Sequence, residues 1–206
     1  LHSLRIEADI EPVRAGQFPK LGLDIDGEIV GRPFAIVSAP DVPFLEFYFS
    51  TVPEGPLSPR LSALKAGDSI RVAPKPNGFL VLDEVPPAIH RGLLSTGTGL
   101  GPFLSILNTP EPWQRFQRVV LVHAVRTADE LAYRRTIARI AEAEPKRFAY
   151  IPFLSREAAD YALAGRIPQA IGDGRLEARA GLSLDAALAH VMLCGNPAMV
   201  ADATAA

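Results

Sequence analysis

The pattern of the chain changes at Pro86-Pro87, and this change constrains the fold more than any other feature. Before it, glycines and prolines separate short apolar and β-branched runs, which is typical of small all-β domains. After it, apolar runs alternate with helical stretches, which predicts a parallel sheet covered by helices on both faces. We therefore predict an antiparallel β-barrel over residues 1–86 and a Rossmann-like α/β domain over residues 87–206.

The same periodicities predict the individual elements. The strands expected in the first part are residues 4–8, 18–25, 34–38, 45–51, 69–73 and 79–82, with one short helix over 58–64. The strands expected in the second part are residues 92–95, 119–125, 148–154 and 191–194. The helices expected after them begin at Pro102 or cover residues 129–143, 166–171 and 197–201.

Charge and cysteine content exclude several classes of protein. The chain has 21 Lys and Arg against 23 Asp and Glu, so it has no net positive field for nucleic acid or an anionic membrane. No apolar run approaches the ~20 residues of a membrane-spanning helix. The single cysteine, Cys194, excludes an internal disulfide and indicates a reduced compartment, for which we expect the cytoplasm.

A glycine-rich loop, STGTGLGP over residues 95–102, follows an apolar strand and precedes a helix. Gly97 and Gly99 permit a tight turn and a close backbone approach, so free N–H groups can face a phosphate. The loop is not a P-loop, because no Lys follows it, and its spacing differs from the standard dinucleotide motif. A strand-to-helix turn without a ligand is the alternative.

Two segments of the first part also suit phosphate or a planar ring. Arg32 and Phe34 open an expected strand, where an arginine can bind phosphate and an aromatic face can stack on a cofactor. The Gly55 turn leads into a short helix with Ser58 as a candidate N-cap. A solvated arginine, a core phenylalanine and an ordinary capped helix are the alternatives.

The last expected strand ends in Cys194-Gly195-Asn196-Pro197. Asn196 and Pro197 suit the N-cap and the first position of a helix. Cys194 then lies at the carboxyl end of a parallel strand, where ligands of such sheets bind. A small buried side chain is the alternative role of Cys194, and no pattern pairs it with a histidine base.

Basic and hydroxyl side chains follow the second and third strands of the α/β part. They are Arg126, Ser155, Arg156 and Arg166. Such residues suit the 2′-phosphate of NADP, whereas an acidic residue after the second strand suits NAD. Binding of NAD through Asp129 is one alternative, and arginines that are simply solvated are the other.

Six ordered motifs carry a resemblance over nearly the whole chain. They are RPFAIVSAP, LEFYFSTVPEGPLSPRL, LLSTGTGLGPFLSIL, VVLVHAVR with ELAY, SRE with GRIP, and MLCGNP. In this order the sequence resembles the ferredoxin–NADP reductase family, most closely its bacterial FAD-containing branch. The resemblance implies an FAD-binding barrel, an NADP-binding α/β domain and a flavin in the cleft between them.

The resemblance also assigns expected roles to single residues of the first part. Arg32 would pair with the FAD pyrophosphate, Phe34 would stack on the isoalloxazine ring and Ile36 would add backbone contacts. The turn residues Gly55, Leu57 and Ser58 would complete the diphosphate site.

In the α/β part, Thr98 with Gly97 and Gly99 would meet NADPH and the flavin. Arg156 and Arg166 would hold the 2′-phosphate, with Arg126 and Ser155 beside them. Cys194 and Gly195 would border the nicotinamide, so Cys194, Phe34 and Ala35 are the expected catalytic positions, without a metal.

The sequence departs from the family at several places. Ala35 stands where many members carry a serine that hydrogen-bonds the redox-active flavin nitrogen, and Phe34 stands where tyrosine is usual. Substitution at position 35 would shift the potential or slow transfer without abolishing FAD binding. Bacterial members continue past the MLCGNP motif to a segment that shields the flavin, and begin with a fuller first strand. We therefore expect a chain truncated at both ends.

The first functional hypothesis is a monomeric FAD-dependent reductase that exchanges electrons between NADPH and a transient partner, ferredoxin or flavodoxin. The second is the reductase component of an oxygenase-type chain. With one cysteine, the chain could not itself hold an iron–sulfur cluster in that role. The third is a non-catalytic flavin-binding remnant. The four dispersed histidines are expected to be structural.

Overall fold

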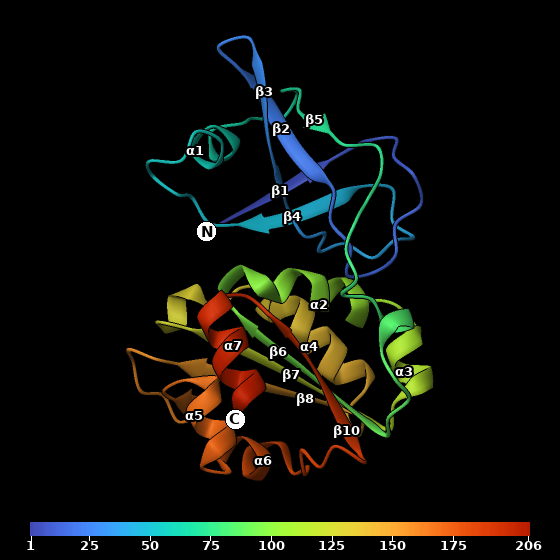
Figure 1. Ribbon diagram of the computed structural model, residues 1–206, viewed down its shortest axis with the longest axis vertical. Coiled ribbons are helices and arrows are strands. Elements are labelled where there is room, and N and C mark those ends of the chain that lie inside the picture. The colour runs from blue at the N-terminus through green and yellow to red at the C-terminus, as the bar shows by residue number, and fades with distance from the viewer.

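A computed structural model describes residues 1–206 and places a β-rich part above an α/β part in Figure 1. The β-rich part contains five strands and one short helix. They are β1 (His2–Ile6), β2 (Lys20–Ile25), β3 (Glu28–Pro33), β4 (Leu45–Phe49), α1 (Ser58–Ser62) and β5 (Arg71–Val72). All pairings between these strands are antiparallel, as expected.

The strands of the β-rich part form two small sheets. One sheet pairs β1 with β4, and the other has the order β3-β2-β5. Single bridges, Ile36 with Phe47 and Phe18 with Asn77, add contacts outside these strands. Leu21, Ile36 and Phe47 are fully buried at the centre.

The predictions of two strands in this part were wrong. Residues 34–38 make only the single bridge at Ile36, because their amides alternate between partners: Phe34 and Ile36 donate to the segment before β2, and Val37 donates to Glu46 on β4. Residues 79–82 form no strand, and a 3₁₀ turn begins at Leu82. The hairpin strand β3 was not predicted, because its residues show no apolar alternation and it lies largely exposed to solvent.

The α/β part has a five-stranded parallel sheet with the order β10-β6-β7-β8-β9. Its strands are β6 (His90–Thr96), β7 (Arg118–Val125), β8 (Phe148–Leu154), β9 (Leu163–Ala164) and β10 (Ala189–Cys194). The helices are α2 (Leu100–Leu107), α3 (Glu111–Arg115), α4 (Arg134–Ala143), α5 (Ile167–Gly172), α6 (Arg175–Ala180) and α7 (Pro197–Ala205). The predicted parallel sheet is confirmed.

Helices cover both faces of this sheet, because successive residues of a buried strand point to opposite sides. Leu93 packs with α2 and α4 in one cluster, whereas its neighbour Leu94 packs with α5, α6 and α7 in another. Figure 1 shows α2 lying between the sheet and the β-rich part. No helix is both long and apolar enough to cross a membrane.

The predicted helix over residues 129–143 is interrupted. A 3₁₀ turn covers Ala128–Glu130, and α4 begins only at Arg134 because Tyr133 adopts a left-handed conformation with φ of 56°. Such a φ is uncommon for a bulky side chain. The Tyr133 ring packs against Tyr48, and its hydroxyl donates to Glu46, both on β4.

Candidate functional site

The sheet order places the candidate site at the end of two neighbouring strands. The connections from β6 lead through β7 and β8 in one direction, while β10 lies on the other side of β6. This is a topological switch point, and ligands of open α/β sheets bind outside the carboxyl ends of the strands there. The glycine-rich loop follows β6 at this point, and Cys194 ends β10 directly beside it in register with Ser95.

The loop and the end of β10 are packed backbone against backbone. A Cβ atom on Gly99 would lie 2.5 Å from the carbonyl oxygen of Cys194, and one on Gly195 would lie 2.1 Å from Thr96 Oγ1. The Asn196 amide also donates to Thr96 Oγ1 at 2.8 Å. The structure therefore brings together two segments predicted separately, the glycine-rich loop with Gly97, Thr98 and Gly99, and the strand end with Cys194 and Gly195.

The glycine-rich loop leaves its backbone open to a ligand. Gly97 has φ of +52°, and a Cβ atom there would meet nothing within 4 Å. Residues Gly97–Gly99 form a 3₁₀ turn that leads directly into α2 at Leu100, two residues before the predicted start at Pro102. Backbone N–H groups at the start of a helix suit an anionic ligand.

His123 lies behind this loop and was not predicted as part of the site. It is fully buried on β7, and its Nε2 lies 3.0 Å from the Gly97 carbonyl oxygen. Burial lowers the pKa of His123 to about 4, although the Gly97 hydrogen bond and Glu130 act in the opposite direction. A neutral imidazole therefore donates from Nε2 to the Gly97 carbonyl oxygen and ties the glycine-rich loop to β7.

Three arginines follow the carboxyl ends of neighbouring strands of the sheet. Arg126, Arg156 and Arg166 follow β7, β8 and β9, whose last residues are paired in register, and the Arg156 amide donates to the Arg126 carbonyl at 2.9 Å. All three side chains are exposed, and their guanidinium groups make no ion pair or hydrogen bond within the chain. Ser155 is exposed between them. This cluster suits a phosphate group.

A second basic surface lies on the β-rich part. A groove of about 680 Å³ contains the side chains of Lys20, Arg32 and Arg71, no acidic side chain, and Pro56 of the Gly55 turn. The Arg32 guanidinium donates only to the neighbouring Gly31 carbonyl, at 2.8 Å. The groove brings Arg32 beside the second predicted phosphate segment, so its charge fits the pyrophosphate of a dinucleotide such as FAD.

The predicted N-cap role of Ser58 was wrong. The N-cap of α1 is the buried Leu57, without a side-chain hydrogen bond, and Ser58 Oγ instead accepts the Val52 amide at 2.8 Å. Ser58 therefore closes the turn around Gly55 through the Val52 amide. The predicted cap at Asn196 is confirmed, because its side chain accepts the amides of Ala198 and Met199.

The segment after Arg32 leads from the basic groove to the start of α2. The half-buried Phe34 ring packs edge-on against Phe49 at 5.7 Å, which leaves part of the ring free. A Cβ atom on Gly101 of α2 would lie 3.2 Å from the Val37 side chain and 4.0 Å from Ala35 Cβ. Residues 35–37, with buried Ile36, therefore rest against the start of α2, next to the glycine-rich loop.

Neither an activated cysteine nor a cluster of metal-ligating side chains marks the site. Burial raises the pKa of the half-buried Cys194 thiol, so Cys194 is not an activated nucleophile. No three His, Cys, Asp or Glu side chains come together to hold a metal ion. The arrangement offers backbone amides and unpaired guanidinium groups at the carboxyl ends of the parallel strands, and a partly free aromatic ring in the β-rich part.

Comparison with known proteins first identifies the class of protein to which the chain belongs. Residues 93–205 match the oxidoreductase NAD-binding domain family. A ferredoxin NADP⁺ reductase from Neisseria gonorrhoeae, solved with bound FAD and NADP, has a TM-score of 0.92 and 32% sequence identity. That comparison covers 98% of this chain and 82% of the solved one. The fold and the matched domain are those of a nicotinamide-nucleotide-dependent oxidoreductase.

Two curated relatives narrow the class to a family. The chain is 48% identical over 202 residues to the flavodoxin/ferredoxin–NADP reductases of Shigella flexneri and Escherichia coli, with 98% of this chain and 82% of each relative covered. The chain belongs to the flavodoxin/ferredoxin–NADP reductase family of oxidoreductases. The family expected from the six motifs is confirmed.

Proposed function

We propose that the chain binds FAD and NADPH and passes electrons from NADPH to ferredoxin or flavodoxin. The observation that carries this proposal is the contact of residues 35–37 with the start of α2. It brings the segment suited to a flavin against the loop suited to a nicotinamide nucleotide. When bound, FAD accepts a hydride from NADPH and releases electrons singly, so the task of the chain is to orient two rings and exclude water.

On the FAD side, Arg32 binds the pyrophosphate within the basic groove, and the turn residues Gly55, Leu57 and Ser58 shape its rim. Phe34 stacks on the isoalloxazine ring with the face that Phe49 leaves free. Ala35 and Ile36 border the ring through their backbone. The cationic groove and the half-buried ring support these assignments.

On the NADPH side, the 2′-phosphate lies among Arg126, Ser155, Arg156 and Arg166, and preference for NADPH over NADH follows from their charge. The backbone of Gly97, Thr98 and Gly99 faces the pyrophosphate and nicotinamide. Cys194 and Gly195 border the reacting ring, where the neutral thiol packs rather than reacts. The unpaired guanidinium groups and the open side of Gly97 support these roles.

At the scale of the chain, residues 1–86 form the FAD domain and residues 87–206 the NADP domain. The two antiparallel sheets are the two sides of a flavin barrel, which the bridge between Ile36 and Phe47 supports. The chain acts as a monomer that meets its one-electron partner transiently. Location in the cytoplasm stays a prediction from the single cysteine.

The test is an anaerobic titration of the purified, FAD-loaded chain. NADPH should bleach the flavin absorbance band, NADH should do so much more slowly, and added ferredoxin or flavodoxin should restore the band. Retained flavin absorbance without bleaching by either nucleotide would contradict the reductase proposal and indicate a protein that only binds flavin.

A further inference from the structure

Glu46 of β4 is a buried carboxylate at the boundary between the two parts of the molecule. Its side chain is 9% exposed. Oε1 accepts the Ser3 hydroxyl at 2.8 Å and the Tyr133 hydroxyl at 2.7 Å, while Oε2 accepts Arg5 Nε at 2.9 Å. Ser3 and Arg5 belong to β1 of the β-rich part, but Tyr133 belongs to the α/β part. The Tyr133 bond thus joins the two parts across 87 residues of sequence.

An uncommon backbone conformation places the Tyr133 hydroxyl for its hydrogen bond to Glu46. Its φ of 56° ends the turn after β7 and turns the chain into α4. Its ring packs edge-on against Tyr48, the β4 neighbour of Glu46, at 5.3 Å. A bulky residue in this conformation persists where the surroundings over-determine it, and such residues concentrate at functional positions. The ring contact and the hydroxyl bond both reach across the boundary.

A second polar bridge continues from the backbone of Glu46. The Glu46 amide donates to Ser38 Oγ at 3.1 Å, and the Ser105 hydroxyl of α2 donates to the Ser38 carbonyl at 2.7 Å. A chain of hydrogen bonds therefore runs from the start of α4 through Glu46 and Ser38 to the middle of α2. Ser38 ends the segment suited to the flavin, and α2 begins at the glycine-rich loop. We call Ser38, Glu46, Ser105 and Tyr133 the boundary network.

We propose that Glu46 and Tyr133 are positioning residues, which hold the β-rich part and the α/β part in the orientation that hydride transfer requires. This inference rests on the proposed function. The reacting rings are bound by different parts, so a small rotation between the parts separates the rings while leaving each binding surface intact. Transfer between positioned groups is steeply sensitive to such displacement. Loss of the network therefore lowers the transfer rate and not the affinity for either cofactor.

The chain offers a matched set of variants. Tyr133→Phe removes only the bridging hydroxyl, and Glu46→Gln removes the carboxylate charge. Tyr48→Phe is the control, because the Tyr48 hydroxyl is buried at the same boundary without a hydrogen-bond partner. In stopped flow with the FAD-loaded proteins, we expect about tenfold slower flavin reduction by NADPH for Tyr133→Phe and Glu46→Gln. FAD content and NADP⁺ affinity should stay within about twofold, and the double variant should lose no more than either single variant.

A second measurement reports the orientation without turnover. Amide residual dipolar couplings of the FAD-loaded wild-type protein should fit one alignment tensor for both parts, whereas Tyr133→Phe should require two. A wild-type rate for Tyr133→Phe, or slower reduction with one common tensor, would overturn the inference. If the wild type takes no hydride from NADPH, the proposed function fails, and the couplings still decide whether Tyr133 holds the two parts. If Glu46→Gln does not fold, Tyr133→Phe alone carries the test.

Discussion

The buried His123 side chain makes the stability of the protein depend on pH. Burial lowers its pKa in the folded state to about 4, against about 6.5 in an unfolded chain. Between these values the unfolded state binds a proton that the folded state excludes, so stability falls as the pH falls from 6.5 toward 4. At pH 5 this group alone costs about 2 kcal/mol of the stability present at neutral pH.

The measurement is urea unfolding at pH 7.5 and pH 5 for the wild type and His123→Gln. Carboxylates titrate in both proteins, so the quantity of interest is the difference between their pH dependences. The variant should lose about 2 kcal/mol less than the wild type on acidification, because glutamine does not titrate. Equal losses would show that His123 is already accessible to protons in the folded protein.

Arg156 is expected to distinguish the two nicotinamide nucleotides. Its guanidinium group has no partner within the chain, so its replacement disturbs no other contact. Arg156→Ala should raise the KM for NADPH about tenfold or more and leave the KM for NADH within about twofold, since only NADPH carries the 2′-phosphate. Arg139→Ala is the control, because Arg139 is an exposed arginine of α4 whose guanidinium group donates to Asn108, the C-cap of α2. An equal effect on both nucleotides would remove Arg156 from the phosphate site.

At the scale of elements, the contact between the start of α2 and the end of β10 leaves no room for a side chain. Gly99 has φ of −61°, which any residue can adopt, yet a Cβ atom would lie within 2.8 Å of three backbone atoms of Cys194 and Gly195. Backbone cannot move aside as a flexible side chain does. Gly99→Ala should therefore lower the unfolding free energy by about 1–3 kcal/mol, as overpacking does.

Gly172→Ala in α5 is the matched control for that substitution. A Cβ atom at Gly172 would meet nothing within 4 Å. Alanine favours helix more than glycine, so this variant should be unchanged or slightly more stable in thermal or urea unfolding. Similar losses at both positions would show that the α2–β10 contact is looser than its geometry implies.

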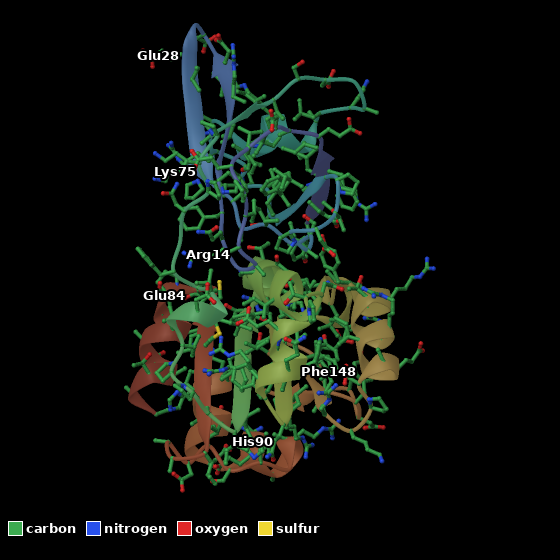
Figure 2. All side chains as sticks on the ribbon, turned by 90° about the vertical axis from the view of Figure 1, so that its right-hand side faces the viewer. Arg14, Glu28, Lys75, Glu84, His90 and Phe148 are labelled. Atoms are coloured by element: carbon green, nitrogen blue, oxygen red, sulfur yellow. The ribbon has the colours of Figure 1, made fainter.

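At the scale of the whole molecule, two arginines donate hydrogen bonds to residues 82–86, the segment that connects the β-rich part to the α/β part. Arg115 donates to the carbonyls of Leu82 and Val85, and Arg91 donates to that of Pro86. Both guanidinium groups lie over the Phe116 ring, at 5.4 and 4.6 Å from its centre. Burial, followed by the nearby Arg115, lowers the pKa of Arg91 to about 10. In Figure 2 the labelled Glu84 of this segment lies at the junction, far from His90 at the opposite end of β6.

Arg115→Ala should lower the unfolding free energy by about 1–3 kcal/mol, because two backbone carbonyls of the connecting segment lose their charged donor. Arg175→Ala removes a solvent-exposed ion pair to Asp173 and one hydrogen bond to the Ala164 carbonyl, so it should lower the unfolding free energy less than Arg115→Ala does. Urea unfolding of both variants tests the difference. Indistinguishable values would mean that water replaces Arg115 at the connecting segment.

Features that depend on local pattern were predicted well. The strands β6, β7 and β8 are mostly buried apolar runs, β10 is apolar but only partly buried, and the Asn196 cap depends on residues two and three positions away. The glycine-rich loop and Cys194 were predicted as separate segments, and the sheet order placed them side by side. The strands predicted over residues 34–38 and 79–82 were wrong, because the apolar character of a segment does not show whether neighbouring strands lie beside it to pair with its backbone.

By itself, the sequence determined the family, the parallel sheet and the residue types available for phosphate, since periodicity and short motifs are local properties. Only the tertiary structure decided which side chains meet: His123 behind Gly97, Ser58 around the Gly55 turn, and Tyr133 on Glu46. The physical reason is that a hydrogen bond requires two groups within about 3 Å, and residues 87 positions apart reach that distance only after the chain has folded.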